Sequence, residues 1–437
     1  MGLSGVRPPP GFYHRLWTPV ITLWYLTWQC LHERHTLENA VIDARRGGAD
    51  RLCVKGKRLS EALRSKATTS YSDARQRLPL HWVVECFGKM AAALLGLTQG
   101  AGEPLPIRLL DGSTKRLRPY GTVPEQFPAH RTKRQRPYWC VARVVVSFCA
   151  LTGIAAAARI AALPVSEQAL AVQLILEQAQ RLLYIGDRNF GVWRVVRAAV
   201  QSGGHALVRL TEVRARHLLG VHRLPARLDQ LLVWSPTRHD QVDGGLLRAP
   251  IAGRLLILKT NRRGFRPQSL YLFTTLTDPQ AYPPRKLLEL YGRRWQVELD
   301  FRTIKSSMGM AQSEAKTPDM VRKEFYAGLM AYNLVRGLMA LAAEQGACSA
   351  PELSFTKIHA LLASALTELF MSWMSGTACR NRLEWLLQEA AAAKLPRRRK
   401  PRPNELRAQY YKPQSYPKMT RSREQARQLL VNATHKS

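Results

Sequence analysis

Apolar residues recur along this chain at two spacings, and the change from one to the other predicts an α/β protein. Short β-branched or apolar runs, typical of buried strands, occur between residues 104 and 210 as "PLPIRLL", "ARVVVSFC", "LLYIG" and "HALVRL". Between these runs, "VSEQALAVQLILEQAQRL" (165–182) and "GVWRVVRAAVQSGG" (191–204) have helical periodicity. A Thr-Gly turn at 152–153 predicts a β-hairpin, and Trp193 is expected in the core.

The pattern changes after residue 210. Residues 211–283 contain three β-like runs separated by turns, "QLLVWSP", "RLLILKT" and "SLYLFTTL", and predict a β-rich insertion. Residues 1–100 are mostly helical by periodicity and form either a small DNA-binding domain or a helical cap on the main core. The expected parts are a helical N-terminal region, a core, the insertion, a core helix that carries the polar motif described below, and C-terminal helices with a basic tail, at residues 1–100, 101–210, 211–283, 284–345 and 346–437.

An apolar run at residues 16–31, "LWTPVITLWYLTWQCL", predicts a buried helix. It contains a proline and three tryptophans but no small-residue cleavage pattern, which argues against a signal peptide. It is also shorter than a membrane span. No membrane partner is therefore expected.

The charge of the chain predicts an anionic partner. Lys and Arg number 66 against 31 Asp and Glu, which gives a formal net charge of +35. Nucleic acid is the usual partner of such a surplus, because cations that neutralise phosphates release counterions. The alternative is a protein that is simply basic or that associates with the ribosome. The seven cysteines form no CxxC pair, which argues against a disulfide framework or a zinc site and suits a reducing cytoplasm.

The stretch "YGRRWQVELDFRTIKSSMG" (291–309) is predicted to lie on one helix that spans residues 288–308. Its apolar side chains form a stripe that faces the core: Val297, Phe301, Ile304 and Met308. A polar stripe roughly 60° wide lies beside it, made of Tyr291, Arg294, Glu298 and Lys305. Taken alone, this quartet is most simply a rim of salt bridges next to the core.

Two aspartates that follow predicted strands change this interpretation. Asp111 ends the strand "PIRLLD" at an Asp-Gly turn, and Asp187 ends "LLYIGD". Either acid alone is most simply a turn or cap residue. Together with Glu298 from a packed helix, they supply the carboxylates that a pair of Mg²⁺ ions needs. Two such ions about 3.5–4 Å apart stabilise the attacking and leaving oxygens in phosphodiester chemistry.

These motifs resemble those of a known family of enzymes. "DGS" at Asp111, "DRNF" at Asp187 and Y-x2-R-x3-E-x6-K at residues 291–305 are similar to the motifs of DDE-type transposases of bacterial insertion sequences. The group is the insertion-sequence-four family, which is named for its Tyr-Arg-Glu-Lys signature. The likeness extends from about residue 60 to residue 425 and includes "SDARQRLP" and "PRRRKPRPN". The first 55 residues carry no matching signature.

The resemblance implies a ribonuclease-H-like catalytic core with a β-rich insertion between the second aspartate and the glutamate, plus helical N-terminal and C-terminal regions. It implies a catalytic triad that binds two Mg²⁺ ions, for which Mn²⁺ can substitute, made of Asp111, Asp187 and Glu298. It also implies that phosphates at the transposon end are contacted by Tyr291, Arg294 and Lys305. The chemistry of these side chains agrees, because Arg suits bidentate phosphate contacts and Lys acts as a point charge.

Other side chains are candidate DNA contacts. Arg188 holds a phosphate or orients Asp187, with a local salt bridge as the alternative. Trp295 stacks on a base near the cut or packs in the core. Further phosphate contacts are expected from a basic hairpin tip and a basic arm, at Arg262, Arg263, Arg266 and the run 397–400.

The expected function is that of a transposase, which binds the inverted repeats at transposon ends, cuts the DNA there and joins the 3′-hydroxyl to a target. The expected partners are double-stranded DNA, as transposon ends and target, and a second copy of the chain in a homodimeric end complex. The expected location is the bacterial cytoplasm, in association with the nucleoid. A metal-dependent nuclease without strand transfer and a catalytically decayed DNA-binding protein are the alternatives. The β-rich insertion and the basic tail favour the transposase over the nuclease.

Overall fold

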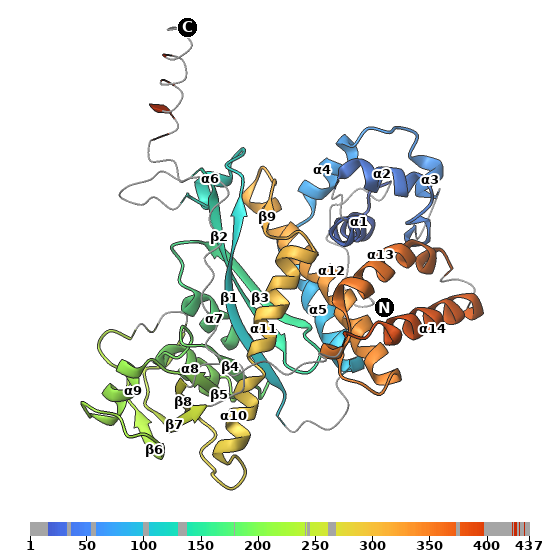
Figure 1. The fold of residues 1–437 in the computed structure, drawn as a ribbon. Coiled ribbons are helices and arrows are strands. Elements are labelled where there is room, and N and C mark those ends of the chain that lie inside the picture. The colour runs from blue at the N-terminus through green and yellow to red at the C-terminus, as the bar shows by residue number, and fades with distance from the viewer. Residues whose placement is uncertain are drawn as a thin grey trace.

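One mixed β-sheet crosses the molecule, and helices cover both of its faces (Figure 1). The computed structural model describes residues 16–32, 36–53, 58–98, 105–129, 138–178, 180–240, 242, 245–260, 268–372, 376–396, 422, 424, 425, 428 and 432. The expected DNA contacts at Arg262, Arg263, Arg266 and the run 397–400 lie outside these residues.

The described strands follow the order β3-β2-β1-β4-β5-β8-β7-β6, and β9 pairs with the far end of β1. Their bounds are β1 Ile107–Leu117, β2 Cys140–Cys149, β3 Ala155–Ala162, β4 Leu183–Gly186, β5 His205–Arg209, β6 Leu228–Trp234, β7 Ile251–Thr260, β8 Gln268–Thr274 and β9 Gln312–Ser313. Among the first five strands, β2 alone runs against the others. This order and direction are those of a ribonuclease-H-like core, so the expected fold class is confirmed.

Helices make up most of the remaining described chain. The N-terminal ones are α1 Pro19–Leu31, α2 Leu37–Arg45, α3 Leu59–Ala62, α4 Thr69–Arg77 and α5 Leu80–Thr98. Those within the sheet region are α6 Val123–Gln126, α7 Glu167–Leu176, α8 Trp193–Gln201 and α9 Glu212–Leu219. Those after the sheet are α10 Pro284–Gly292, α11 Trp295–Arg302, α12 Pro318–Gln345, α13 Phe355–Ser372 and α14 Gly376–Ala392, with a π-helical turn at Thr303–Ser307 and 3-10 turns at Asp50–Leu52 and Ala350–Glu352.

The predicted hairpin is present as β2 and β3. The two strands pair in antiparallel register from Ala142 opposite Ala162 to Phe148 opposite Ala155. Gly153 lies in the connecting turn with a φ of +74°, a left-handed conformation that glycine adopts without steric cost. A side chain at this position would also meet the guanidinium of Arg336 at about 3.0 Å. Local turn chemistry and close packing therefore both require glycine here.

Alternate residues of the central strands enter two different cores. Leu109 of β1 belongs to a core with α5, α11 and α12, whereas its neighbour Leu110 belongs to a core with α7 and α8. Ile185 of β4 and Leu207 of β5 lie on the same face as Leu109. This alternation follows from the strand period of two. We name the two surfaces of the sheet the α11 face and the α7 face.

The three β-like runs in residues 211–283 form β6, β7 and β8. These strands do not stand apart from the core, because β8 pairs with β5 through Leu207 opposite Thr274 and continues the main sheet. The buried side chain of Arg254 helps to hold this extension, since its guanidinium donates to both carboxylate oxygens of Asp229 at 2.5 Å and to the carbonyl of Tyr282 at 2.7 Å. Arg254 thus ties together parts of the insertion, and the pairing of β8 with β5 joins the insertion to the edge of the core.

Helices α1, α5 and α12 are the apolar helices of the α11 face. α1 is buried along most of its length, as predicted for the run 16–31, and it packs on α12. In the described chain α5 and α12 are long and apolar enough to cross a membrane by composition, which is weak evidence because a core helix passes the same test. α12 is mostly buried within this protein, and α5 packs along it.

A buried ion pair ties α11 to α12. Asp300 of α11 is fully buried and bonds to the guanidinium of Arg336 on α12, which also donates from Nε to the hydroxyl of Tyr332 at 2.8 Å. Gln296 donates to the same carboxylate at 3.2 Å. Asp300 lies two residues after Glu298, so this pair fixes the helix that carries the glutamate.

We predict that Asp300→Ala lowers the free energy of unfolding by about 3–5 kcal/mol, because it leaves the Arg336 charge buried without its partner. The matched control is Glu289→Ala on α10, where the Arg285–Glu289 pair is exposed and should contribute little. Chemical denaturation of both variants measures the difference. Equal midpoints for the two variants would show that the buried pair does not anchor α11.

Candidate active site

The register between β1 and β4 places Asp111 beside Asp187. Leu109 pairs with Ile185 in parallel register, and each aspartate lies two residues further along its own strand direction. Because side chains alternate, both carboxylates lie on the α11 face with Leu109 and Ile185. Neighbouring strands are about 4.8 Å apart. Two acids that are 76 positions apart in the sequence are therefore neighbours in the fold.

Asp111 does not end its strand, so the prediction of an Asp-Gly turn is wrong. β1 continues to Leu117, and every residue from Arg108 to Leu117 pairs with β2. This pairing outweighs the local turn preference of Asp-Gly. Gly112 leaves space for Glu167 and does not form a turn, because a Cβ at this position would lie 2.5 Å from Cδ of Glu167.

Asp187 follows the last residue of β4, as predicted. Its carboxylate accepts a hydrogen bond from the backbone N–H of Asn189 at 2.8 Å, which fixes the turn "DRNF". Arg188, between them, is exposed, so it is accessible to a ligand. The strand end thus presents an oriented carboxylate followed by an accessible cation.

The motif helix is broken, so the prediction of one helix over residues 288–308 is wrong. α10 ends at Gly292, a weak helix former, and α11 begins at Trp295. Around this break, backbone N–H groups between Arg293 and Val297 bond to carbonyls three residues earlier, as in a 3-10 helix. A π-helical turn then carries Lys305, which is half-buried. The apolar stripe is nevertheless buried as predicted, at Val297, Phe301, Ile304 and Met308.

Arg294 interacts with two of the three acids. Its guanidinium donates to Oε1 of Glu298 at 2.6 Å, and its charge also acts on Asp111, whose pKa it lowers. The side chain of Glu298 is 38% exposed, and that of Arg294 is 18% exposed. The arginine therefore balances part of the negative charge of the acids in this structure.

Asp111 has a strongly shifted acidity. Burial, together with the negative charges of Asp187 and Glu167, raises the pKa of its carboxyl to about 7. The backbone N–H of Gly112 and the guanidinium of Arg294 oppose this shift. Near neutral pH, Asp111 is thus poised between its protonated and ionised forms. A perturbed carboxyl of this kind is a marker of functional sites.

Arg209 completes a row of charged side chains and is absent from the sequence predictions. Gly186 of β4 pairs with Val208 of β5, so the next residues, Asp187 and Arg209, are neighbours on the α11 face. The Nε of Arg209 is buried with no hydrogen-bond acceptor among the described residues. The strand-end pattern that identifies Asp187 also occurs in "HALVR", where it could have identified Arg209.

Tyr291 lies close to Arg294, Arg209 and Asp187, whose charges act on its hydroxyl. Its side chain is 8% exposed, and burial raises the pKa of its hydroxyl while the charges of Arg294 and Arg209 lower it. Trp295, at the start of α11, is 49% exposed and so is not a core residue. Arg294, Arg209 and the hydroxyl of Tyr291 therefore lie close to the aspartates, and the exposed Trp295 follows Arg294 in the chain.

The arrangement partly fits a divalent cation. Paired carboxylates suit Mg²⁺, and Asp111 and Asp187 supply such a pair. Within the described ranges, no three His, Cys, Asp or Glu side chains are close enough together to hold one ion. Glu298, the predicted third ligand, is bound to Arg294 instead. The residues that would hold the metal are the aspartate pair, with Glu298 added once it leaves Arg294.

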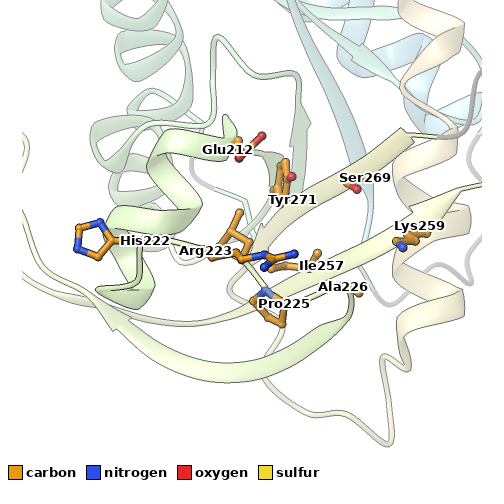
Figure 2. A pocket seen from close by; sticks show the side chains of 10 residues that line it. Glu212, His222, Arg223, Pro225, Ala226, Ile257, Lys259, Ser269 and Tyr271 are labelled. Atoms are coloured by element: carbon orange, nitrogen blue, oxygen red, sulfur yellow. The ribbon is translucent and has the colours of Figure 1, made fainter.

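A second feature is a cavity of about 610 Å³ (Figure 2), and none of these acids is among its lining residues. Its lining residues include Arg223, Lys259 and Tyr271, and they come from β7, β8 and the segment before β6. Tyr271 alternates with Leu272 of the α11-face core, so the cavity opens on the α7 face. It does not belong to the carboxylate site.

Comparison with known proteins identifies the family of the chain. The family model described as "Transposase DDE domain" matches residues 102–334, which include both aspartates, the cavity region and the motif helices. This match covers more than half of the chain. The matched segment thus contains the whole described β-sheet, from β1 to β9.

Two relatives and one solved structure are similar to the chain. The transposase InsG for insertion sequence element IS4 of Escherichia coli is 30% identical over 183 residues, which is 41% of this chain and 40% of that protein. The putative transposase y4zB of Sinorhizobium fredii is 33% identical over 85 residues, which is 20% of this chain and 23% of that protein. A piggyBac transposase synaptic complex with hairpin DNA, solved by cryo-EM, is 10% identical with a TM-score of 0.41, over 87% of this chain and 76% of that one.

The aligned regions span less than half the length of both curated relatives. The match to InsG nevertheless agrees with the insertion-sequence-four group that the motifs indicate. The match to the family model, over residues 102–334, includes the sheet, the paired aspartates and the start of α12. The chain therefore belongs to the family of proteins that contain a transposase DDE domain.

Proposed function

We propose that this protein is a transposase that binds transposon ends, cuts the DNA there and joins the new 3′-hydroxyl to a target. The observation that supports this most directly is the pair of adjacent carboxylates, Asp111 and Asp187, on one face of a ribonuclease-H-like sheet. In the first step, water attacks the phosphodiester and a 3′-hydroxyl leaves. In the second, that 3′-hydroxyl attacks a target phosphodiester and a target 3′-hydroxyl leaves.

Asp111, Asp187 and Glu298 are the proposed catalytic residues. When bound by them, two Mg²⁺ ions, or Mn²⁺ in their place, would activate the attacking oxygen and stabilise the leaving one. For Glu298 to join the aspartates, its hydrogen bond to Arg294 must break. A phosphate of the DNA is the natural new partner for the released guanidinium, because Arg binds phosphate through paired N–H groups.

The cations around the aspartates are the proposed DNA contacts. Arg294, Lys305 and the hydroxyl of Tyr291 bind phosphates of the transposon end, and Arg209 joins them, since its buried Nε has no acceptor among the described residues. Two exposed side chains extend this surface, the phosphate contact Arg188 and the base-stacking residue Trp295.

The wider assembly follows from the same proposal. The helical N-terminal region α1–α4 contributes to end recognition, and two copies of the chain hold two transposon ends. The positive charge of the whole chain favours such a complex, since +35 needs anionic compensation. The proposed location is the bacterial cytoplasm, where the DNA lies.

Asp111→Asn should abolish cleavage of a transposon-end duplex, with a rate loss of about a thousandfold or more, because it removes a ligand of ions that contribute several kcal/mol to the transition state. End binding should persist, since no cation is removed. Gel-shift and cleavage assays in Mn²⁺ measure both properties.

The matched control for this change is Asp278→Asn, because Asp278 caps the turn before α10 and lies outside the site. Cleavage by Asp111→Asn at the rate of the control would refute the metal-site assignment. With pre-cut ends and a target, joined product supports the transposase. Nicked target without joined product identifies a nuclease instead.

The affinity for Mn²⁺ should depend on pH through Asp111. The carboxyl must lose its proton to bind a metal, and its pKa is raised to about 7. Below that pH the proton competes, so affinity should rise about tenfold per pH unit and then level off above it. Calorimetric titration one unit below and one unit above this pKa provides the measurement. An affinity that is constant across this range would contradict the predicted ionisation.

The affinity for the transposon end should fall steeply with salt. If 6–10 phosphates are contacted, affinity falls by about 10³–10⁵ between 50 mM and 200 mM salt. Lys305→Ala should reduce the slope of log K against log salt by about 0.9, whereas Lys357→Ala on the distant helix α13 should leave it unchanged. Fluorescence anisotropy gives the slopes, and an identical slope for both variants would remove Lys305 from the phosphate contacts.

A further inference from the structure

Glu167 is a carboxylate beside the aspartate pair that the proposed mechanism does not use. It is the first residue of α7, after the N-cap Ser166, and only 20% of its side chain is exposed. Its charge reaches Asp111, whose pKa it raises. A further acid so close to a negatively charged pair is unfavourable unless other contacts compensate.

The contacts of Glu167 connect it to Asp187 through Asn189. The side-chain amide of Asn189 donates to Oε2 of Glu167 at 2.5 Å, and the backbone N–H of Asn189 donates to Oδ1 of Asp187 at 2.8 Å. The amide of Gln168, next to Glu167, donates to the carbonyl of Asn189 at 3.0 Å. The first turn of α7 thus holds Asn189 at both its side chain and its backbone.

Glu167 approaches from the α7 face, which lies on the other side of β1 from Asp111. Gly112, next to Asp111, points toward that face, and a Cβ on it would lie 2.5 Å from Cδ of Glu167. Arg143 of β2 lies 3.5 Å from the carboxylate and offsets its charge. The glycine therefore makes room for the glutamate, and the sheet separates the glutamate from the α11 face, where the DNA would lie.

We propose that Glu167 is a positioning residue that sets the orientation of the Asp187 carboxylate through Asn189. The proposal deepens the transposase function above and rests on it. A charge-assisted hydrogen bond to Asn189 fixes the turn after β4, and that turn holds the carboxylate toward the metal-binding side. Outer partners of this kind affect metal affinity or activity by about 10–100-fold when removed.

Glu167→Ala tests this role, and Glu177→Ala is its matched control. Glu177 follows the other end of α7 and forms an ion pair with Arg159, so the same truncation there also removes an ion pair. The measurement is the Mn²⁺ concentration that gives half-maximal cleavage of a transposon-end duplex. We expect an increase of about 10–100-fold for Glu167→Ala and none for Glu177→Ala, with gel-shift affinity unchanged in both.

Two further variants separate positioning from a purely structural effect. Glu167→Gln keeps a hydrogen-bond acceptor for Asn189 and should recover part of the Mn²⁺ affinity. Asn189→Ala, at an exposed position, should match Glu167→Ala, and the double variant should be no worse than either single one, because both changes break the same connection. Additive losses would show that the two residues act independently and would overturn the proposal.

The failure of this inference is distinguishable from the failure of the proposed function. If Glu167→Ala requires no more Mn²⁺ than Glu177→Ala while Asp187→Asn is inactive, the positioning role is wrong and the metal site stands. If Asp187→Asn itself cleaves DNA at the normal rate, the metal-site assignment fails, and the positioning role fails with it.

Discussion

The parallel pairing of β1 with β4 sets the geometry of the candidate active site. It sets Leu109 opposite Ile185 and so brings Asp111 next to Asp187 on one face. A shift of one residue in this register would move one aspartate to the opposite face. The antiparallel partner β2 holds β1 along its length and the two cores hold both faces, so such a shift would disrupt burial on each side.

The remaining parts of the site are attached to this pair by rigid elements. The buried Asp300–Arg336 bond fixes α11 on α12, and with it Glu298 and Arg294. From the other face, α7 holds the turn after β4 through Glu167 and Asn189. Arg294 and Arg209 lie close to the acids, and such cations suit a polyanionic ligand.

Sequence patterns predict the local elements well, because those elements follow from local properties. The β2–β3 hairpin follows from β-branched runs and Gly153, and α7 follows from its periodicity and the Ser166 cap. Asp187 at the end of β4 is also predictable. The path of β1 through Asp111 and Gly112 is not, because pairing with β2 is a long-range interaction that outweighs the turn preference. The approach of Glu167 likewise depends on tertiary packing, which no local pattern encodes. The break after Gly292 has a local signal, because glycine is a weak helix former.

The central claim is that Asp111 and Asp187 bind a divalent cation and that Glu298 joins them when it leaves Arg294. A crystal structure of the protein with Mn²⁺ and a transposon-end duplex, with an anomalous difference map to locate the Mn²⁺, tests it most directly. The account predicts an anomalous peak shared by the Asp111 and Asp187 carboxylates, with Glu298 turned toward it and Arg294 on a DNA phosphate. An anomalous peak elsewhere, with the two aspartates facing no metal, would contradict it.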